Sequence, residues 1–335
     1  MNSTKEWLLL TEQTQKNIFS ETAKAIGLPD AAVEKDWWVV HTLSAVFATE
    51  IGPHTVFKGG TSLSKAWNLI ERFSEDIDLA LDCKFLGFDQ EMTISQVKKL
   101  RKKSYEYISA ILFPALQTQF ENMGLGVNMK IESVKDTDKD PLIIQVEYPS
   151  VVEGTDYILP RVLIEIGSRS LKEPFSLKTF SSFVGEVYAG RSFADAPITI
   201  PCVNPERTFL EKIFLLHEEF QKPPEKIRAY RMSRHLYDLG KLMNSPFAEK
   251  AFEDDLQLYH TIVAHRQLMT PLRGVDYANH KPAFINPLPL PQMLADWQKD
   301  YQVMQEFMIY GESLPFDKLM AELTILKEKI NNLAK

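Results

Sequence analysis

Two aspartates, Asp76 and Asp78, stand two positions apart in SEDIDLAL, a segment that alternates polar and apolar residues as a half-buried strand does. In such a strand both carboxylates project from one face while Ile77 points into the core. Neighbouring carboxylates repel each other and perturb each other's pKa values, and a divalent cation relieves that repulsion. Carboxylate oxygens completed by substrate phosphates are the ligands that Mg²⁺ prefers, and Mn²⁺ can take its place. The pair therefore predicts a metal site with Asp76 and Asp78 as ligands.

A glycine-rich turn precedes the aspartates. Gly59 and Gly60 allow a backbone to approach a ligand closely. Thr61 and Ser62 follow at the start of an expected helix, where free N–H groups favour a phosphate. Lys65, one turn further along, is another candidate phosphate ligand. Phosphates on the turn and a metal on the aspartates suit in-line attack on a nucleotide phosphate.

Strands and helices alternate around these residues. Residues 54–60 predict a short strand ending in the glycine turn, residues 61–72 a helix, and residues 74–81 the strand of the aspartates. We expect further helices and strands on both sides: helices over 4–25, 30–50 and 92–123, and strands over 126–134, 141–150 and 160–170. From Asn204 onward nearly every segment has helical periodicity. The sequence thus predicts an α+β fold, with a mixed sheet flanked by helices in residues 1–200 and an α-helical domain in residues 201–335.

Composition excludes several classes of protein. The 335 residues carry a formal net charge of -7, whereas a protein that binds nucleic acid through its overall charge would be basic. Two cysteines, Cys83 and Cys202, are too few for a disulfide framework or a four-ligand zinc site. No segment has the roughly 18 apolar residues of a membrane span, and the first residues lack the apolar core of a signal peptide. We expect a cytoplasmic protein with no membrane partner.

Five segments together resemble a known family. They are FKGGTSLSKAW, RFSEDIDL, the upstream EKDWW, and the downstream ERTFLEKIF and RHLYDLGKL. In this order, over roughly residues 33–245, they are similar to the AbiEii/AbiGii nucleotidyltransferase toxins of the DNA polymerase β-like nucleotidyltransferase superfamily. The signature of that superfamily is G-[GST]-S followed by D-x-D. The resemblance implies a metal-dependent enzyme that releases pyrophosphate from an NTP.

The resemblance also implies a third carboxylate on a neighbouring strand. Glu165 fits, because Arg161, Leu163 and Glu165 share one face of an expected strand, and an acidic residue between two isoleucines needs a partner. Glu147, in LIIQVEY, is a competing strand carboxylate. Glu165 would join the aspartates as a metal ligand.

Two residues of the helical domain match family positions. Lys212 in ERTFLEKIF would bind the phosphates or the base side of the nucleotide, and we expect it to be exposed. Asp238 in RHLYDLGKL would orient the nucleotide or a basic neighbour, so the helical domain would complete the nucleotide and acceptor site. Ordinary ion pairs are the alternative: Lys212 with Glu211 or Glu206, and Asp238 with Arg234.

The expected function is transfer of NMP from an NTP to an acceptor hydroxyl. The resemblance suggests the toxin of a toxin–antitoxin or phage-defence pair, with a cognate antitoxin protein as partner and the tRNA 3′ end as acceptor. The alternatives are a protein or small-molecule acceptor, or a degenerate, non-catalytic binding module.

An RNA acceptor requires a local basic surface on this acidic chain. The sequence offers two basic stretches, Lys98–Lys103 and Lys222–Arg234. The second is the expected RNA contact, because Lys212 and Asp238 bracket it.

Overall fold

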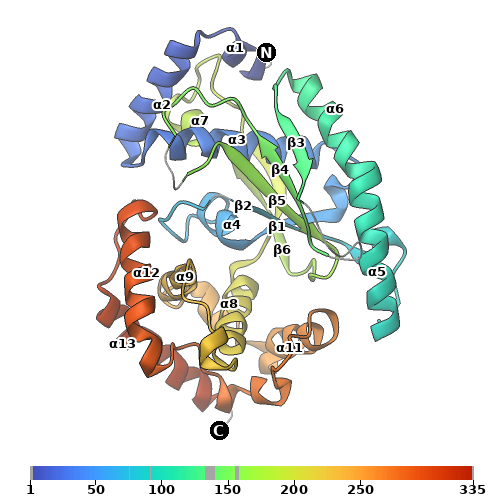
Figure 1. Ribbon diagram of the computed structural model, residues 1–335, viewed down its shortest axis with the longest axis vertical. Coiled ribbons are helices and arrows are strands. Elements are labelled where there is room, and N and C mark those ends of the chain that lie inside the picture. The colour runs from blue at the N-terminus through green and yellow to red at the C-terminus, as the bar shows by residue number, and fades with distance from the viewer. Residues whose placement is uncertain (1–2, 75, 91, 133–139, 155–157, 334–335) are drawn as a thin grey trace. The chain divides into compact units, whose positions relative to one another are not determined.

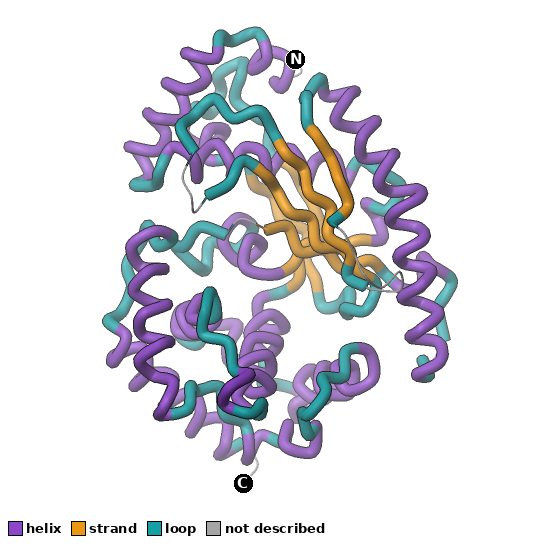
Figure 2. Tube along the Cα trace, in the orientation of Figure 1, coloured by secondary structure: helices purple, strands orange, loops and turns teal. Residues whose placement is uncertain are grey.

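Two compact units make up the protein in a computed structural model that describes residues 3–74, 76–90, 92–132, 140–154 and 158–333. The sheet unit comprises residues 1–66 and 73–203, and the helical unit comprises residues 67–72 and 204–335. The strands of the described residues all lie in the sheet unit, where helices flank them, and the helical unit is built of helices, which confirms the expected α+β fold class (Figure 2).

The sheet unit is built on seven strands in the order β3-β4-β5-β2-β1-β7-β6 (Figure 1). Pairs β2–β5 and β1–β7 are parallel and the other pairs are antiparallel, so the sheet is mixed, as predicted. The strands are β1 (Thr55–Lys58), β2 (Asp76–Leu81), β3 (Asn128–Ile131), β4 (Leu142–Glu147), β5 (Arg161–Gly167), β6 (Phe175–Phe180) and β7 (Ile198–Val203).

Helix α3 (Asp30–Phe47) packs against strands β2, β5 and β7 and is buried almost all round. Its acidic residues Glu34 and Asp36 are buried as well, and Asp36 pairs with Lys65. Trp37 and Trp38 are 1% and 6% exposed, so these two residues lie in the core. The other helices of this unit are α1 (Ser3–Leu8), α2 (Glu12–Ile26), α4 (Gly59–Lys65), α5 (Ile94–Tyr107), α6 (Phe113–Met123) and α7 (Phe183–Val187).

The helix expected over residues 61–72 is wrong beyond Lys65. Asn68 has a φ of 52°, in the left-handed region that a continuing α-helix cannot contain. The chain then leaves the sheet unit: Trp67 stacks edge-on against Phe247, and Arg72 forms a β-bridge with Ile309, both within the helical unit. Strands β6 and β7 were not predicted, because β7 contains Pro201 and β6 is an exposed edge strand.

The helical unit is arranged around α8 (Pro205–Phe220), which is buried over most of its length. The predicted helix containing Asp238 begins only at Ser233, because Arg231 has a φ of 58° and breaks the preceding run. Asp300 accepts hydrogen bonds there from the backbone N–H groups of Arg231 and Ser233, at 2.6 and 2.9 Å. The remaining helices are α9 (Ser233–Leu242), α10 (Pro246–Lys250), α11 (Gln257–Met269), α12 (Leu294–Phe307) and α13 (Phe316–Asn332). In the described ranges no helix has a long enough apolar stretch to cross a bilayer.

A buried ion pair holds α8 and α11 together. Glu218 of α8 is 1% exposed and accepts hydrogen bonds from both Arg266 Nε, at 2.8 Å, and Arg266 Nη2. Its other neighbour is His280, whose Nε2 lies 3.2 Å away. Burial alone would raise the pKa of Glu218, but hydrogen bonds from Arg266 and His280 outweigh burial and lower it. Stability from this carboxylate is therefore present above its ordinary pKa of 4.5 and is lost as the pH falls.

We expect Glu218→Ala to destabilise the protein by about 3 kcal/mol, because it leaves the partly buried guanidinium of Arg266 without its partner. Glu106→Ala is the control: Glu106 pairs with Lys102 at 3.8 Å on an exposed helix face, and its loss should change stability by about 0.5 kcal/mol or less. Denaturant unfolding at pH 7 and pH 4 measures both, and the Glu218→Ala difference should shrink at pH 4. Equal effects of the two substitutions would contradict this account.

Candidate active site

Three carboxylates lie on one face of the sheet. In the parallel pair β2–β5, Asp78 stands opposite Glu165 and Ile77 opposite Ile164. Both isoleucines are buried, whereas Asp76, Asp78 and Glu165 are only partly buried, so the three acidic residues share the more open face. The register brings together the three residues that the sequence proposed as metal ligands.

Glu147 occupies a different place. It lies on β4, one strand further from β2, and stands opposite Arg161 rather than opposite Glu165. Its carboxylate accepts hydrogen bonds from Lys130 at 2.7 Å and from Asn128 at 3.0 Å. Hydrogen bonding to Lys130 lowers the pKa of Glu147. Of the two candidate third carboxylates, Glu165 lies beside Asp78, whereas Glu147 forms an ion pair with Lys130.

The glycine turn lies directly against the Asp78 carboxylate. Gly59 has a φ of 81°, and a Cβ on it would lie 2.9 Å from Asp78 Cγ and overlap the carboxylate oxygen. Glycine is therefore required here both for its backbone conformation and for the close approach. Thr61 fixes the same junction, because its buried hydroxyl donates a hydrogen bond of 2.6 Å to the carbonyl oxygen of Asp76. The turn and the aspartate strand are thus held as one assembly.

The other residues proposed as phosphate ligands lie deeper. Ser62 is 2% exposed, and its hydroxyl has no conventional hydrogen-bond partner in the described part of the chain. The nearby Cys202 thiol is also buried, and burial raises its pKa to about 12, with the Ser62 hydroxyl acting in the opposite direction. Gly60 is the second residue of α4. Phosphate binding by Gly60 and Ser62 stays a prediction.

Lys65 forms a buried ion pair. Its ammonium lies 3.0 and 3.1 Å from the two carboxylate oxygens of Asp36 on α3, and 3.8 Å above the ring of Phe183. Burial raises the pKa of Asp36, while Lys65 and the N–H of Phe183 act against that rise. A phosphate would reach Lys65 only in competition with Asp36, so its role as a phosphate ligand stays a prediction.

The donor set on the sheet suits a hard divalent cation. Asp76, Asp78 and Glu165 supply carboxylate oxygens from adjacent strands, which are the ligands Mg²⁺ and Mn²⁺ prefer. In the described residues no three acidic, histidine or cysteine side chains converge closely enough to form a ready-made metal cluster. The residue types and strand register fit a metal, and closer convergence of the side chains would accompany binding.

In the helical unit, Asp238 is fully buried between two cations. Arg72 holds it with a two-pronged pair, Nε to Oδ1 at 2.7 Å and Nη2 to Oδ2 at 2.8 Å, and Lys212 Nζ lies 2.7 Å from Oδ2. Burial would raise the pKa of Asp238, but Arg72 and Lys212 hold it well below the ordinary value. Burial lowers the pKa of Lys212, and Asp238 partly opposes that change.

This cluster corrects one expectation about Lys212 and answers another. Lys212 is 6% exposed, so its expected exposure is wrong. The ion pair found for Lys212 is with Asp238, one of the residues expected to act with it, rather than with Glu211 or Glu206. Arg72 was missed, although it stands in the quoted segment RFSEDIDL, because nothing in the sequence indicates that residues 67–72 belong to the helical unit.

Lys58 is a second residue that the sequence did not single out. It ends β1 and stands opposite Asp78 in the antiparallel pair with β2, so the two residues share one face of the sheet. The sequence could have indicated Lys58, because it directly precedes Gly59 and Gly60 on a strand expected next to the strand of Asp76 and Asp78.

Two cations of the expected RNA contact at Lys222–Arg234 are paired with one carboxylate. Glu219 accepts hydrogen bonds from Lys222 at 2.6 Å and from Arg228 at 2.9 Å. Burial would raise the pKa of Glu219, but Arg228 and Lys222 lower it. One negative charge balances only part of the positive charge of this stretch, and its role as the RNA contact stays a prediction.

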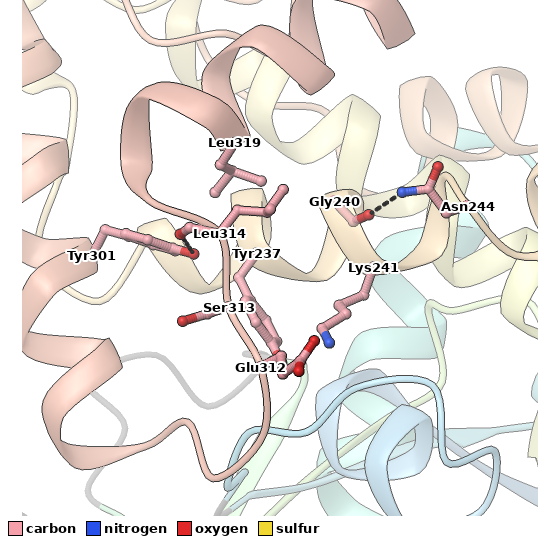
Figure 3. A pocket seen from close by; sticks show the side chains of 9 residues that line it. All are labelled: Tyr237, Gly240, Lys241, Asn244, Tyr301, Glu312, Ser313, Leu314 and Leu319. Atoms are coloured by element: carbon pink, nitrogen blue, oxygen red, sulfur yellow. Dashed lines mark hydrogen bonds between the residues drawn. The ribbon is translucent and has the colours of Figure 1, made fainter.

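A pocket of about 250 Å³ lies within the helical unit (Figure 3). Its walls include Tyr237 and Lys241 of α9, Tyr301 of α12 and the loop residue Glu312. Figure 3 shows Lys241 and Glu312 extending toward one another at one end of the pocket. The sequence did not predict this pocket, because its lining comes from segments far apart in the chain.

No curated protein matches the chain. Among solved structures, MenT4, a nucleotidyltransferase toxin from Mycobacterium tuberculosis H37Rv, is similar at 17% sequence identity and a TM-score of 0.43, over 97% of this chain and 98% of that one. The family model described as "Nucleotidyl transferase AbiEii toxin, Type IV TA system" matches residues 42–322. That range contains both the glycine turn with its carboxylates and the Asp238 cluster, and the chain belongs to the AbiEii family of nucleotidyltransferase toxins.

Proposed function

We propose that this nucleotidyltransferase toxin transfers NMP from an NTP to a hydroxyl group of a structured RNA such as tRNA, in a metal-dependent reaction. The observation that carries the proposal is the packing of the Gly59 turn against Asp78, with Glu165 opposite Asp78 on the next strand. A turn that can approach phosphates thereby lies next to carboxylates that can hold a metal. A cognate antitoxin as partner follows from the type IV toxin–antitoxin family.

Each group has a defined role in this reaction. Asp76, Asp78 and Glu165 would hold Mg²⁺ or Mn²⁺, which would supply charge stabilisation at the oxygens of the reacting phosphate. The backbone of Gly59 and Gly60 and the hydroxyl of Ser62 bind the leaving phosphates. The acceptor oxygen bonds to the α-phosphorus, the bond to the bridging oxygen breaks, and pyrophosphate leaves. Glu165 accepts the proton of the acceptor hydroxyl.

The Asp238 cluster contributes a nucleotide contact. Two cations, Arg72 and Lys212, surround one carboxylate, so the cluster carries a net positive charge in a buried setting. A nucleotide phosphate is an anion that such a charge attracts. We assign the nucleotide contact to Lys212. Asp238 and Arg72 hold the ammonium of Lys212 in place.

The decisive test is incubation with each α-labelled NTP and Mg²⁺, in the presence of total RNA and of cell lysate. Label on RNA supports the proposal. Label on protein or a small molecule keeps the chemistry and overturns the acceptor. Absence of label with every NTP indicates the non-catalytic alternative.

Asp76→Asn should lower the transfer rate about 100-fold or more, since it removes one charged ligand from the metal site. Calorimetry with Mn²⁺ and a non-hydrolysable NTP should show weaker metal binding in the same variant. Glu147→Gln is the matched control, because Glu147 is a carboxylate on a strand of the same sheet and its partner is Lys130. Unchanged metal affinity in Asp76→Asn would refute the assignment.

Lys212→Met should weaken NTP binding and lower kcat/KM while the protein stays folded. The apolar part of the side chain is kept, and Asp238 retains its two-pronged pair with Arg72. Lys241→Met serves as the control, because Lys241 pairs with Glu71 at a more open position of the same unit. Nucleotide titration and a thermal melt measure the two effects. Wild-type nucleotide affinity in Lys212→Met would show that the family role does not apply to this lysine.

A further inference from the structure

Helix α5 presents a cationic face to solvent. Lys98, Lys99, Lys102 and Lys103 are all exposed, while Val97, Leu100 and Ser104 on the other side of the helix are buried. The only carboxylate on the helix is Glu106, 3.8 Å from Lys102. Within the described ranges no carboxylate forms an ion pair with Lys98, Lys99 or Lys103. Three of the four lysines of this face are therefore not paired with a carboxylate in the described part of the chain.

Two arginines extend the positive charge toward the carboxylates of the sheet. Arg101, on the same helix, is half-buried, and its Nε is shielded from solvent without a hydrogen-bond partner among the described residues. Arg169 follows β5, and its Nε lies 3.6 Å from Asp140. Arg169 stands two residues beyond the end of β5, the strand that carries Glu165.

We propose that α5, together with Arg101 and Arg169, is the docking surface for a structured RNA and leads its backbone toward Glu165. This inference rests on the proposed function for the identity of the acceptor. Exposed lysines suit the evenly spaced phosphates of a nucleic-acid backbone, and arginine suits a phosphate held at a fixed position. Because the whole chain is acidic, a polyanion must be attracted by a local surface, and Arg169 of this surface follows the strand that carries Glu165.

The composition of the face favours RNA over an acidic protein. Between Lys98 and Lys103 every exposed side chain is a lysine, and the one leucine is buried. Ile94, one turn before Lys98, is 72% exposed, but a single apolar side chain is fewer than the cluster of aromatic or apolar anchors from which a protein interface draws most of its binding energy.

The test compares two variants of equal net charge. Lys98, Lys99, Lys102 and Lys103 are changed to glutamate in the first, and the exposed lysines Lys24, Lys299, Lys318 and Lys329 in the second. Fluorescence anisotropy with labelled tRNA measures affinity at several salt concentrations, and calorimetry with Mg²⁺ and a non-hydrolysable NTP measures nucleotide binding. Far-UV circular dichroism confirms that both variants are folded.

We expect the α5 variant to bind tRNA at least about tenfold more weakly at low salt, with a salt slope smaller by about 3, since each lost phosphate contact removes roughly 0.7–0.9. Its NTP affinity and the tRNA affinity of the control should match wild type. Equal loss of tRNA affinity in both variants, or wild-type affinity in the α5 variant, would overturn the proposal. The proposal would also be overturned if the α5 variant no longer labelled a protein acceptor while its tRNA affinity stayed unchanged. That result would identify an acidic protein as the partner.

A second variant, Arg101→Gln with Arg169→Gln, tests the link to the reacting centre. We expect NMP transfer to fall more than tRNA affinity, because the RNA still docks on the lysines but its end is no longer guided. Transfer and affinity reduced by the same factor would contradict that guiding role. If wild type binds tRNA through α5 but transfers no NMP to any acceptor, the proposed function fails while the docking surface stands.

Discussion

The contact between Gly59 and the carboxylate of Asp78 constrains the whole sheet unit. No side chain fits between them, and the backbone of Gly59 must adopt a positive φ to make the approach. Thr61 then fixes the start of α4 to Asp76 by a hydrogen bond across the same junction. Strands β1 and β2 must run antiparallel with Lys58 opposite Asp78 for this geometry to exist. The position of β5, and with it Glu165, follows from its register with β2.

Buried ion pairs fix the remaining chemistry-bearing residues in both units. Lys65 is anchored to Asp36 in the sheet unit, and Asp238 is anchored to Arg72 and Lys212 in the helical unit. Such pairs contribute little net stability, because desolvation of the charges offsets their attraction, but removing one partner is costly. Their effect is to restrict each side chain to one position. In sequence, residues 67–72 stand between helix α4 and strand β2 of the sheet unit. They nevertheless belong to the helical unit, and they carry Arg72.

The sequence predicted the parts of the site that depend on local spacing. Asp76 and Asp78 share a face because alternate residues in a strand do, and the glycine turn follows from residue type. The pairing of Glu165 with Asp78 is non-local and was reached only through family resemblance and face alternation. Arg72 and the end of α4 at Lys65 were not predictable in this way, because a left-handed Asn68 and the packing of residues 67–72 in another unit override helical periodicity. The burial of Lys212 was missed for the same reason: its partner is distant in sequence.

Charge distribution ties these observations to the acceptor. The carboxylates that suit a metal also repel the phosphates of a nucleic acid, and the net charge of -7 adds to that repulsion at low ionic strength. Cations must therefore stand beside the carboxylates without neutralising them. A lysine tied to its own glutamate, as Lys222 is to Glu219, cannot do this, because its charge is already balanced at short range. The lysine face of α5 keeps its charge, because Lys98, Lys99 and Lys103 are exposed to solvent. On a protein whose overall charge has the same sign as that of RNA, the surface that would attract a polyanion depends on which cations are already paired, and the number of basic residues in a stretch does not reveal that.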